Sequence, residues 1–357
     1  MSALEPPFGD RDPRGMTARL EGIPDQVERA LERLAAHPWP APERPPARLA
    51  VGGMGGSAIA ADLTRGLYEE RLPRPLEVTR GYRWPGWVGA DTLALLSSYS
   101  GETEETLSLY REAGCRGAAR LALTTGGALG ALCARDGVFV QPLPPGAPPR
   151  AALYASWVAL TALVHALGWG ADPAPEWREA AALLRGRGGL LGADTPEDAN
   201  PAKALARELH GRFVLVYAGA GAMAPVALRW KQQLNENAKL LAHSAVVPEL
   251  DHNEIVGWER PGAPHRDVAL VVLHDHEDAA EVRARLELTA DYARRQGAAV
   301  HEWGTPPGPR LARLAVAVQF GDWLSLYLAL LGGADPTAIP SIDEFKRRLS
   351  SRGSASA

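Results

Sequence analysis

The stretch SSYSGETEET, residues 97–106, joins an apolar run at 92–96 to a helical pattern that includes Leu107 and Tyr110. The apolar run predicts a buried strand. Hydroxyls and a glycine between a strand and a helix start bring free backbone N–H groups and small donors together, at the positive end of the helix dipole. Such a turn suits an anion such as phosphate, but Ser and Thr also cap ordinary helices. Both interpretations stay open on this stretch alone.

Short predicted strands and helices alternate along the first half of the chain. The predicted strands are 47–51, 76–79, 92–96, 119–124 and 137–141. Helices are predicted between the last three strands, at 103–113 and 128–134, and an apolar helix follows at 151–167. The first strand ends in GGMGGS, residues 52–57, before another helix, which is how many α/β proteins bind phosphate. The alternation predicts a parallel, doubly wound sheet.

The second half of the chain repeats this pattern. A strand at 212–218 ends in Gly219 and Gly221 before a helix at 223–234. Later elements are predicted at 268–273, 276–296, 299–303 and 311–331. The turn after 268–273 is HDHE, residues 274–277, which has no hydroxyl and reads as a polar helix start rather than a metal site. We therefore expect an α/β fold of two doubly wound parallel-sheet subdomains, each with three αβα layers, and one phosphate site in the first half.

Proline-rich and polar segments divide the chain into five predicted parts. These are an N-terminal arm and helix at 1–46 (the helix at 17–36), a first α/β domain with the phosphate loops at 47–168, a helical linker at 169–211, a second α/β domain at 212–333, and a C-terminal helix and tail at 334–357. Two domains are what a chain of 357 residues typically forms.

Composition excludes several classes of protein. The formal net charge of -4 gives no basic surface for nucleic acid or for an anionic membrane. No apolar run approaches 18 residues and the first ten residues, MSALEPPFGD, have no apolar core, so a cytoplasmic location without a membrane partner is expected. Cys115 and Cys133 are expected to be reduced structural thiols without metal-ligand spacing.

Five motifs in order resemble the bifunctional phosphoglucose/phosphomannose isomerases of the sugar isomerase (SIS) superfamily. They are GMGGSAI at 53–59, SYSGETEET at 98–106, PRAA at 149–152, WKQQLNENAK at 230–239 and HNEIVGW at 252–258. The first two mark the wider fold, whereas the last two are specific to this branch, and the likeness runs from about 48 to 349. A dinucleotide site is the weaker interpretation, because Ala58 stands where the glycine pattern needs its third glycine.

The resemblance implies an aldose–ketose isomerase that interconverts glucose 6-phosphate, and mannose 6-phosphate, with fructose 6-phosphate through a cis-enediol, without metal or cofactor. It implies Glu236 as the base that moves the proton between C1 and C2. From the residues alone, Glu236 would be a helix-end carboxylate paired with Lys231 or Lys239. Arg150 resembles the residue that stabilises the enediolate, and its permanent charge suits a developing oxyanion.

The resemblance also implies a phosphate site and two ring-opening residues. The phosphate ligands would be Gly56, Ser57, Ser98, Ser100 and Thr103. His252 matches a ring-opening histidine that the neighbouring subunit of a homodimer supplies. Lys346 matches a lysine that assists ring opening, although with Arg347 and Arg348 it also reads as a solvated helix end.

Two positions depart from the family pattern. Glu102 replaces the usual Asn and would repel a phosphate if it pointed inward, whereas pointing outward it would only add to an acidic helix start. Asp251 precedes His252, where a small hydroxylated residue is common, and is a candidate charge partner for that imidazole. Two alternatives stay open: another sugar-phosphate isomerase on the same fold, and a sugar-phosphate-binding regulator without turnover.

Overall fold

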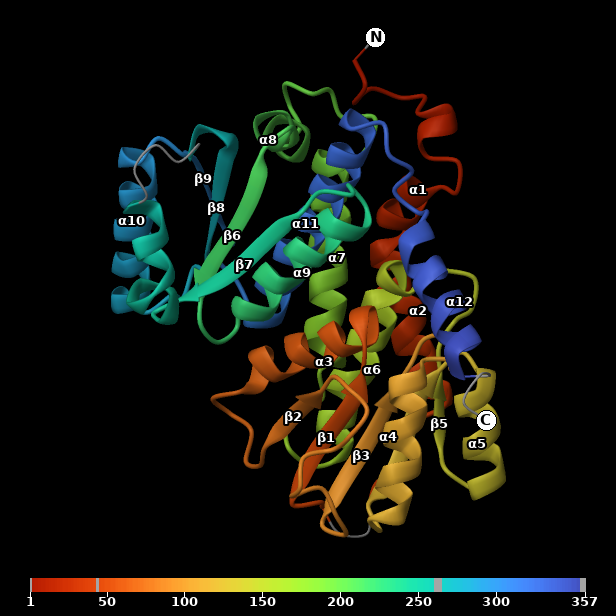
Figure 1. The fold of residues 1–357 in the computed structure, drawn as a ribbon. Helices are drawn as coiled ribbons and strands as arrows, with labels where there is room; N and C mark the ends of the chain where they lie inside the picture. Colours follow the sequence, from red (N-terminus) through yellow and green to blue (C-terminus); the bar gives the residue numbers. More distant parts are fainter. Residues whose placement is uncertain (1, 43–44, 260–264, 354–357) are drawn as a thin grey trace.

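Two separate parallel sheets form the framework of the computed structural model, which describes residues 2–42, 45–259 and 265–353 (Figure 1). Parts of the predicted N-terminal arm (1 and 43–44) and the predicted tail at 354–357 lie outside the described residues. The first sheet has the strand order β2-β1-β3-β4-β5 and the second β7-β6-β8-β9. The predicted architecture of two parallel α/β units is confirmed, while the domain boundaries stay predictions.

Helices cover both faces of the first sheet. Its elements are β1 (Arg48–Gly53), α3 (Gly55–Tyr68), β2 (Leu76–Thr79), β3 (Thr92–Ser97), α4 (Glu104–Cys115), β4 (Ala119–Thr124), α5 (Gly127–Asp136), β5 (Val140–Pro142), the short 3-10 helix η2 (Pro149–Ala152) and α6 (Leu153–Ala166). Successive residues of β1 point to opposite faces: Leu49 and Val51 join the core that contains α3 and α6, and Ala50 joins the one that contains α4 and α5. This alternation produces the three αβα layers.

The second sheet is built in the same way. Its elements are β6 (Phe213–Gly219), α9 (Ala224–Glu236), β7 (Ala242–Val247), the 3-10 helices η3 (Glu249–His252), η4 (Glu254–Glu259) and η5 (His265–Asp267), β8 (Val268–His274), α10 (Ala280–Arg295), β9 (Ala299–Gly304) and α11 (Arg310–Leu331). On β8, Val271 faces the central core and Leu270 faces α10. The central core is therefore shared by both sheets.

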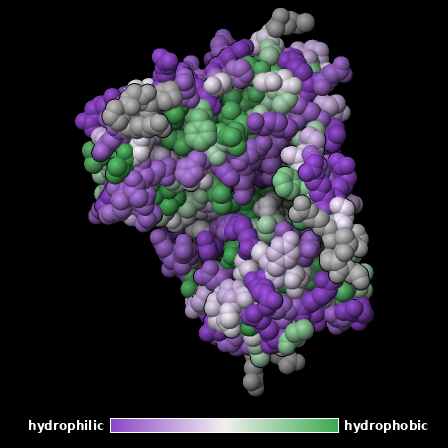
Figure 2. All heavy atoms as spheres, viewed as in Figure 1, coloured by the Kyte–Doolittle hydropathy of each residue, from purple (hydrophilic) through white to green (hydrophobic). Residues whose placement is uncertain are grey.

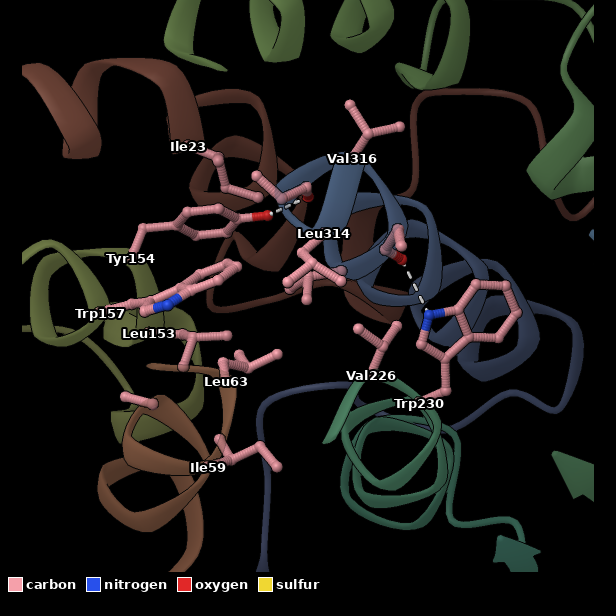
Figure 3. Packing of buried hydrophobic residues seen from close by; sticks show 14 of the residues in the cluster. Ile23, Ile59, Leu63, Leu153, Tyr154, Trp157, Val226, Trp230, Leu314 and Val316 are labelled. Carbon is pink, nitrogen blue, oxygen red and sulfur yellow. Dashed lines mark hydrogen bonds between the residues drawn. The ribbon is translucent and has the colours of Figure 1, made fainter. Parts of the chain in front are cut away.

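The apolar helix α11 lies at the centre of the molecule, between α3, α6 and α9 (Figure 3). Tyr154 of α6 donates its hydroxyl to the carbonyl of Ala315, and the Trp230 indole of α9 donates to the carbonyl of Ala317. Among the described residues α11 is the one helix that is long and apolar enough to cross a membrane. Of its most apolar 18-residue stretch, 94% is buried inside the protein. It serves here as a core helix.

Several elements differ from the sequence-based predictions. The helix expected at 17–36 is two helices, α1 (Met16–Glu21) and α2 (Ile23–Ala36), which meet at Gly22. No strand is predicted for β7, an edge strand whose exposed and half-buried residues, such as His243, lack a clean alternation. The predicted helical linker at 169–211 contains two helices, α7 (Ala174–Leu191) and α8 (Pro201–Leu209), and the C-terminal helix is α12 (Pro340–Gly353).

Hydrophilic side chains cover most of the face seen in Figure 2, with apolar areas over the upper sheet. Both cysteines are free thiols; Cys133 is buried as a structural residue would be, whereas Cys115 is exposed.

Candidate active site

The two polar turns of the first domain meet at the edge of the sheet where strand order reverses. β1 pairs with β2 on one side and β3 on the other, so the chain leaves β1 and β3 in opposite directions. Gly53 and Ser97, the last residues of β1 and β3, are partners in the ladder. A crevice outside the carboxyl ends of strands at such a reversal is where open α/β sheets bind ligands.

Hydrogen bonds fix the hydroxyls of these turns relative to each other. The backbone N–H of Tyr99 donates to Oγ of Ser57, 3.2 Å away, and this bond joins the two turns. Within the second turn, the hydroxyls of Ser98 and Thr103 lie 2.8 Å apart, and the exposed Ser100 accepts from the N–H of Glu102. The turns also lie at the N-termini of α3 and α4, whose first N–H groups have no partner within the helix. Four of the five predicted phosphate ligands thus lie in a preorganised arrangement.

Glycine is required where backbones approach closely. A Cβ added to Gly56 would lie 3.1 Å from the carbonyl oxygen of Pro149, so the glycine turn lies directly against the segment that carries Arg150. A Cβ on Gly101 would overlap the carbonyl of Gly126, and Gly101 also has a positive φ of 72°. These contacts hold the phosphate turns, α5 and Arg150 together.

Glu102 points away from the phosphate turns. Its Oε1 accepts a 2.8 Å hydrogen bond from the backbone N–H of Ala128, in the first turn of α5. A carboxylate at a helix N-terminus is favoured by the free N–H groups and by the helix dipole. Of the two orientations considered from the sequence, the structure has the outward one, although the carboxylate bonds to the start of α5 rather than adding to the start of α4, so it is not directed at the predicted phosphate ligands.

Arg150 is the most buried of the predicted catalytic side chains, at 3% exposure. Its Nε donates to Oδ1 of Asn237 at 2.6 Å, and its Nη2 donates to the carbonyls of Pro336 and Thr337 at 2.7 and 2.9 Å. Its Nη1 lies 3.4 Å from Oε2 of Glu236. The Nε and Nη2 sides of the guanidinium are therefore held by protein, and the Nη1 side reaches the predicted base.

Glu236 ends α9, and its carboxylate pairs with Arg150 rather than with a lysine. The side chain is 29% exposed and lines a pocket with Asn235, Lys239 and the segment that leads into α12. Lys239 instead donates Nζ to the backbone carbonyl of Glu236 at 2.7 Å and to that of Asp335 at 2.7 Å. The lysine pairing inferred from the residues alone is therefore wrong.

Further buried charges set the electrostatics around Arg150. Arg229 donates Nη2 to the carbonyl of Arg150 at 2.8 Å and forms a buried ion pair with Asp322 at 2.9 Å. Burial lowers the pKa of Arg150 from its usual value, the Glu236 carboxylate opposes this, and the charge of Arg229 adds to it. Burial and then the charge of Arg150 lower the pKa of Lys239. Arg150 and Lys239 thus lie near the partly exposed carboxylate of Glu236, while the carboxylates of Asp322 and Asp335 also act on Arg150.

Two residues of this network, Asn237 and Lys239, had no site role in the sequence-based interpretation. Asn237 is fully buried and also donates to Oγ of Ser325 at 2.9 Å. Both residues flank Glu236 in the motif NENAK, which is the signal that could have identified them.

His252 lies far from Glu236 within one chain. Glu236 ends α9 just before β7 begins, whereas His252 ends η3, beyond the other end of that strand. The strand alone separates its ends by about 17 Å, at the usual rise per residue. His252 is exposed and makes no side-chain hydrogen bond with any described residue. Asp251 pairs with Arg285 at 3.0 Å instead of with His252, so the charge pairing considered from the sequence is wrong.

Lys346 is exposed on α12, the helix of the predicted C-terminal part. The first turn of α12, at Pro340, Ser341 and Ile342, borders the pocket of Glu236. Lys346 lies further along the same helix, outside the residues that line this pocket.

The matching reversal in the second sheet carries acids instead of hydroxyls. Asp275 and Glu277 both accept from the buried Arg313, at 2.7 and 2.6 Å, and His274 pairs with Glu302 at 3.0 Å. Carboxylates in this position disfavour a phosphate. The turn is held by ion pairs and not by a helix start, because α10 begins only at Ala280.

Several known proteins are similar to this chain. Residues 198–349 match the family model described as bacterial phospho-glucose isomerase C-terminal SIS domain. A protein of Caldicellulosiruptor bescii named bifunctional phosphoglucose/phosphomannose isomerase is 37% identical over 302 residues, which are 85% of this chain and 89% of that protein. A protein of Aquifex aeolicus with the same name is 31% identical over 298 residues, 83% of this chain and 88% of that protein.

Solved structures share the fold at low sequence identity. A hypothetical protein of Thermus thermophilus superposes with a TM-score of 0.72 at 17% identity, covering 97% of this chain and 92% of that one. The tagatose-6-phosphate ketose/aldose isomerase of Escherichia coli has a TM-score of 0.69 at 14% identity, with coverages of 90% and 94%. The fold is that of the SIS phosphosugar isomerases, and at 37% identity over most of its length the chain belongs to the bifunctional phosphoglucose/phosphomannose isomerase family.

Proposed function

We propose that this chain interconverts glucose 6-phosphate, and mannose 6-phosphate, with fructose 6-phosphate, with Glu236 as the base. The observation that carries the proposal is the Arg150–Glu236 pair, 3.4 Å apart, which lies against the glycine turn of the predicted phosphate site. Binding a sugar phosphate requires only the turns, whereas a partly exposed carboxylate beside a fixed cation also allows proton transfer. This favours an enzyme over a regulator that only binds.

The chemistry divides among the chain's own residues. Ser57, Ser98 and Thr103, with the helix N-termini, hold the phosphate. The carboxylate of Glu236 takes the proton from C2 of the open-chain aldose, and the electron pair moves toward the C1 carbonyl oxygen. The guanidinium of Arg150 stabilises the negative charge on that oxygen. The hydroxyl proton on O2 passes to O1, and return of the proton from Glu236 to C1 then leaves a carbonyl at C2 and a hydroxyl at C1, which is the ketose.

His252 acts in the site of the neighbouring subunit of a homodimer. Its exposure and its position beyond the far end of β7 support this assignment over a role beside Glu236 of the same chain. Val256, an apolar side chain four residues from His252, is 57% exposed and suited to burial between subunits. Lys346 assists ring opening with His252. The free thiols of Cys115 and Cys133 suit a cytoplasmic enzyme.

A kinetic assay tests the activity. Fructose 6-phosphate formation is measured from both aldose phosphates, with chelator present, for the wild type and Glu236→Gln. We expect wild-type turnover that survives chelation, and a loss of several orders of magnitude in the variant. No turnover by the wild type on either sugar supports the binding regulator instead.

Mixed dimers test the sharing of sites. Glu236→Gln and His252→Ala chains are expected to be inactive separately, whereas a mixed dimer would contain one site with both residues intact. We expect partial recovery of activity on mixing. Verified mixed dimers without recovery would contradict the contribution of His252 from the neighbouring subunit.

A further inference from the structure

A cleft of about 490 Å³ lies outside the candidate active site, between the N-terminal helices and the segment 144–147 that precedes η2. Four arginines line it, Arg14, Arg19, Arg29 and Arg33, and no acidic residue is among the described residues that do. None of the predicted catalytic or phosphate-binding residues lines the cleft. Its volume is within the range of small-molecule sites.

The arginines of the cleft are mostly without anionic partners in the described chain. Arg19, Arg29 and Arg33 make no side-chain hydrogen bond or salt bridge with any described residue, and Nε of Arg19 is buried without a partner. Arg14 has one distant partner, Asp335, at 3.9 Å. Burying part of an unpaired guanidinium costs free energy that an anion in the cleft would offset.

The face of α2 explains why these charges gather. Arg29 and Arg33 are four residues apart and therefore lie on one side of the helix, together with Gln26. The acidic residues Asp25 and Glu28 point elsewhere and both pair with Arg185 of α7. Burial followed by the charge of Arg29 lowers the pKa of Arg33, and the charge of the neighbouring Glu32 opposes this only in part.

We propose that this cleft binds a small molecule carrying two or more phosphate groups, at a site separate from that of the sugar phosphate. A guanidinium binds phosphate oxygens through paired, charge-assisted hydrogen bonds, and four guanidiniums exceed what a single phosphate can contact. The alanines and prolines between them, such as Ala18, Ala147 and Pro144, supply apolar surface for the carbon part of such a ligand.

The walls of the cleft are bonded to the candidate active site. Tyr99, which follows the phosphate ligand Ser98, donates its hydroxyl to the carbonyl of Pro144 at 2.7 Å and accepts from the N–H of Ala147 at 3.0 Å. Gln26 donates to the carbonyl of Ala151, the residue after Arg150, at 2.8 Å. A ligand that moved these walls would also move the phosphate turns. Binding in the cleft is therefore expected to alter the affinity for the sugar phosphate, and this expectation alone rests on the proposed function.

Calorimetry with inorganic tripolyphosphate tests the site on the full-length chain. The variants are Arg29→Gln/Arg33→Gln, a matched control with the same charge change on other helices, Arg111→Gln/Arg178→Gln, and Ser98→Ala in the sugar-phosphate turn. We expect tripolyphosphate to bind the wild type at least about tenfold more tightly than orthophosphate, and Arg29→Gln/Arg33→Gln to weaken it by at least about tenfold. The control and Ser98→Ala should stay within about threefold of the wild type.

Three outcomes would overturn the proposal. The first is that tripolyphosphate shows no measurable binding. The second is an equal loss of tripolyphosphate affinity in the two double variants, which would indicate general charge attraction. The third is a loss of affinity in Ser98→Ala with none in Arg29→Gln/Arg33→Gln, which would assign the ligand to the sugar-phosphate turns. Because the readout is heat of binding, a chain without isomerase activity still gives a clear result.

Discussion

Replacing Arg150 by lysine keeps the positive charge but removes the planar guanidinium with its several N–H donors. The guanidinium donates hydrogen bonds in three directions. Nε bonds to Asn237, Nη1 bonds to Glu236, and Nη2 bonds to the carbonyls of Pro336 and Thr337. The ammonium group of a lysine can reach the hydrogen-bond partners in only one of these directions. Each hydrogen bond to a charged group is worth roughly 1.5–3 kcal/mol net, so losing two directions lowers the free energy of unfolding by about 3 kcal/mol or more. A protein with about 5–15 kcal/mol of stability stays folded.

The same substitution separates a catalytic from a structural role. Loss of one preorganised donor to a developing oxyanion costs about 10²–10³ in kcat, so Arg150→Lys should lose at least that factor. Leu286→Ala is the control: it truncates a fully buried side chain of α10, which packs against the outer face of the second sheet, at a cost of about 2–5 kcal/mol. Urea unfolding and steady-state kinetics are measured for both. Leu286→Ala should keep its kcat. Arg150→Lys with reduced stability and a wild-type kcat would refute the role in charge stabilisation.

Three further substitutions probe the surroundings of the site. Glu102→Ala removes the acceptor for the N–H of Ala128, so we expect a loss of about 0.5–2 kcal/mol in urea unfolding with KM within about threefold of wild type; a large fall in KM would mean that the carboxylate repels the phosphate. Ser98→Ala should raise KM for the sugar phosphate by about tenfold, the effect of about 1.4 kcal/mol, and an unchanged KM would remove Ser98 from the phosphate site. For Asp275, burial opposes ionisation but hydrogen bonds from Arg313 outweigh it and lower the pKa, so the folded chain binds fewer protons than the unfolded chain and stability falls as pH drops below about 4. Asp275→Asn should show a shallower fall in urea unfolding over that range, and an equal slope would contradict the assignment.

Local signals carried most of what could be predicted about the first domain. The turn at 97–106 is predicted from an apolar run, a glycine and a helix start, which are all neighbours in sequence, whereas the pairing of Gly53 with Ser97 came only from the structure. The alternation of strands and helices predicted α3, α4 and α5, but not which face of the sheet each of them covers. Short-range patterns of this kind predict the observed elements because they depend little on distant parts of the chain.

Features set by tertiary contacts could not be predicted. The direction of Glu102 depends on the N-terminus of α5, 26 residues further on, and the partner of Glu236 is Arg150, 86 residues away. The edge strand β7 has no clean alternation of buried and exposed residues, so the sequence carries no strand pattern there. The arginine cleft lies between α2 and the proline-rich segment 144–147, and no sequence motif indicates that these two segments meet. These are positions where long-range packing, and not local propensity, decides the conformation.

Exchange of the substrate's C1 and C2 protons with solvent tests the role of Glu236 most directly. The wild type and Glu236→Gln are incubated with fructose 6-phosphate in D₂O, and deuterium at C1 and C2 is followed by NMR. Proton transfer by the Glu236 carboxylate predicts that the wild type incorporates deuterium while glucose 6-phosphate forms, whereas the variant, although folded and still binding the sugar phosphate, incorporates almost none. Deuterium incorporation by Glu236→Gln at the wild-type rate would contradict the assignment of Glu236 as the base.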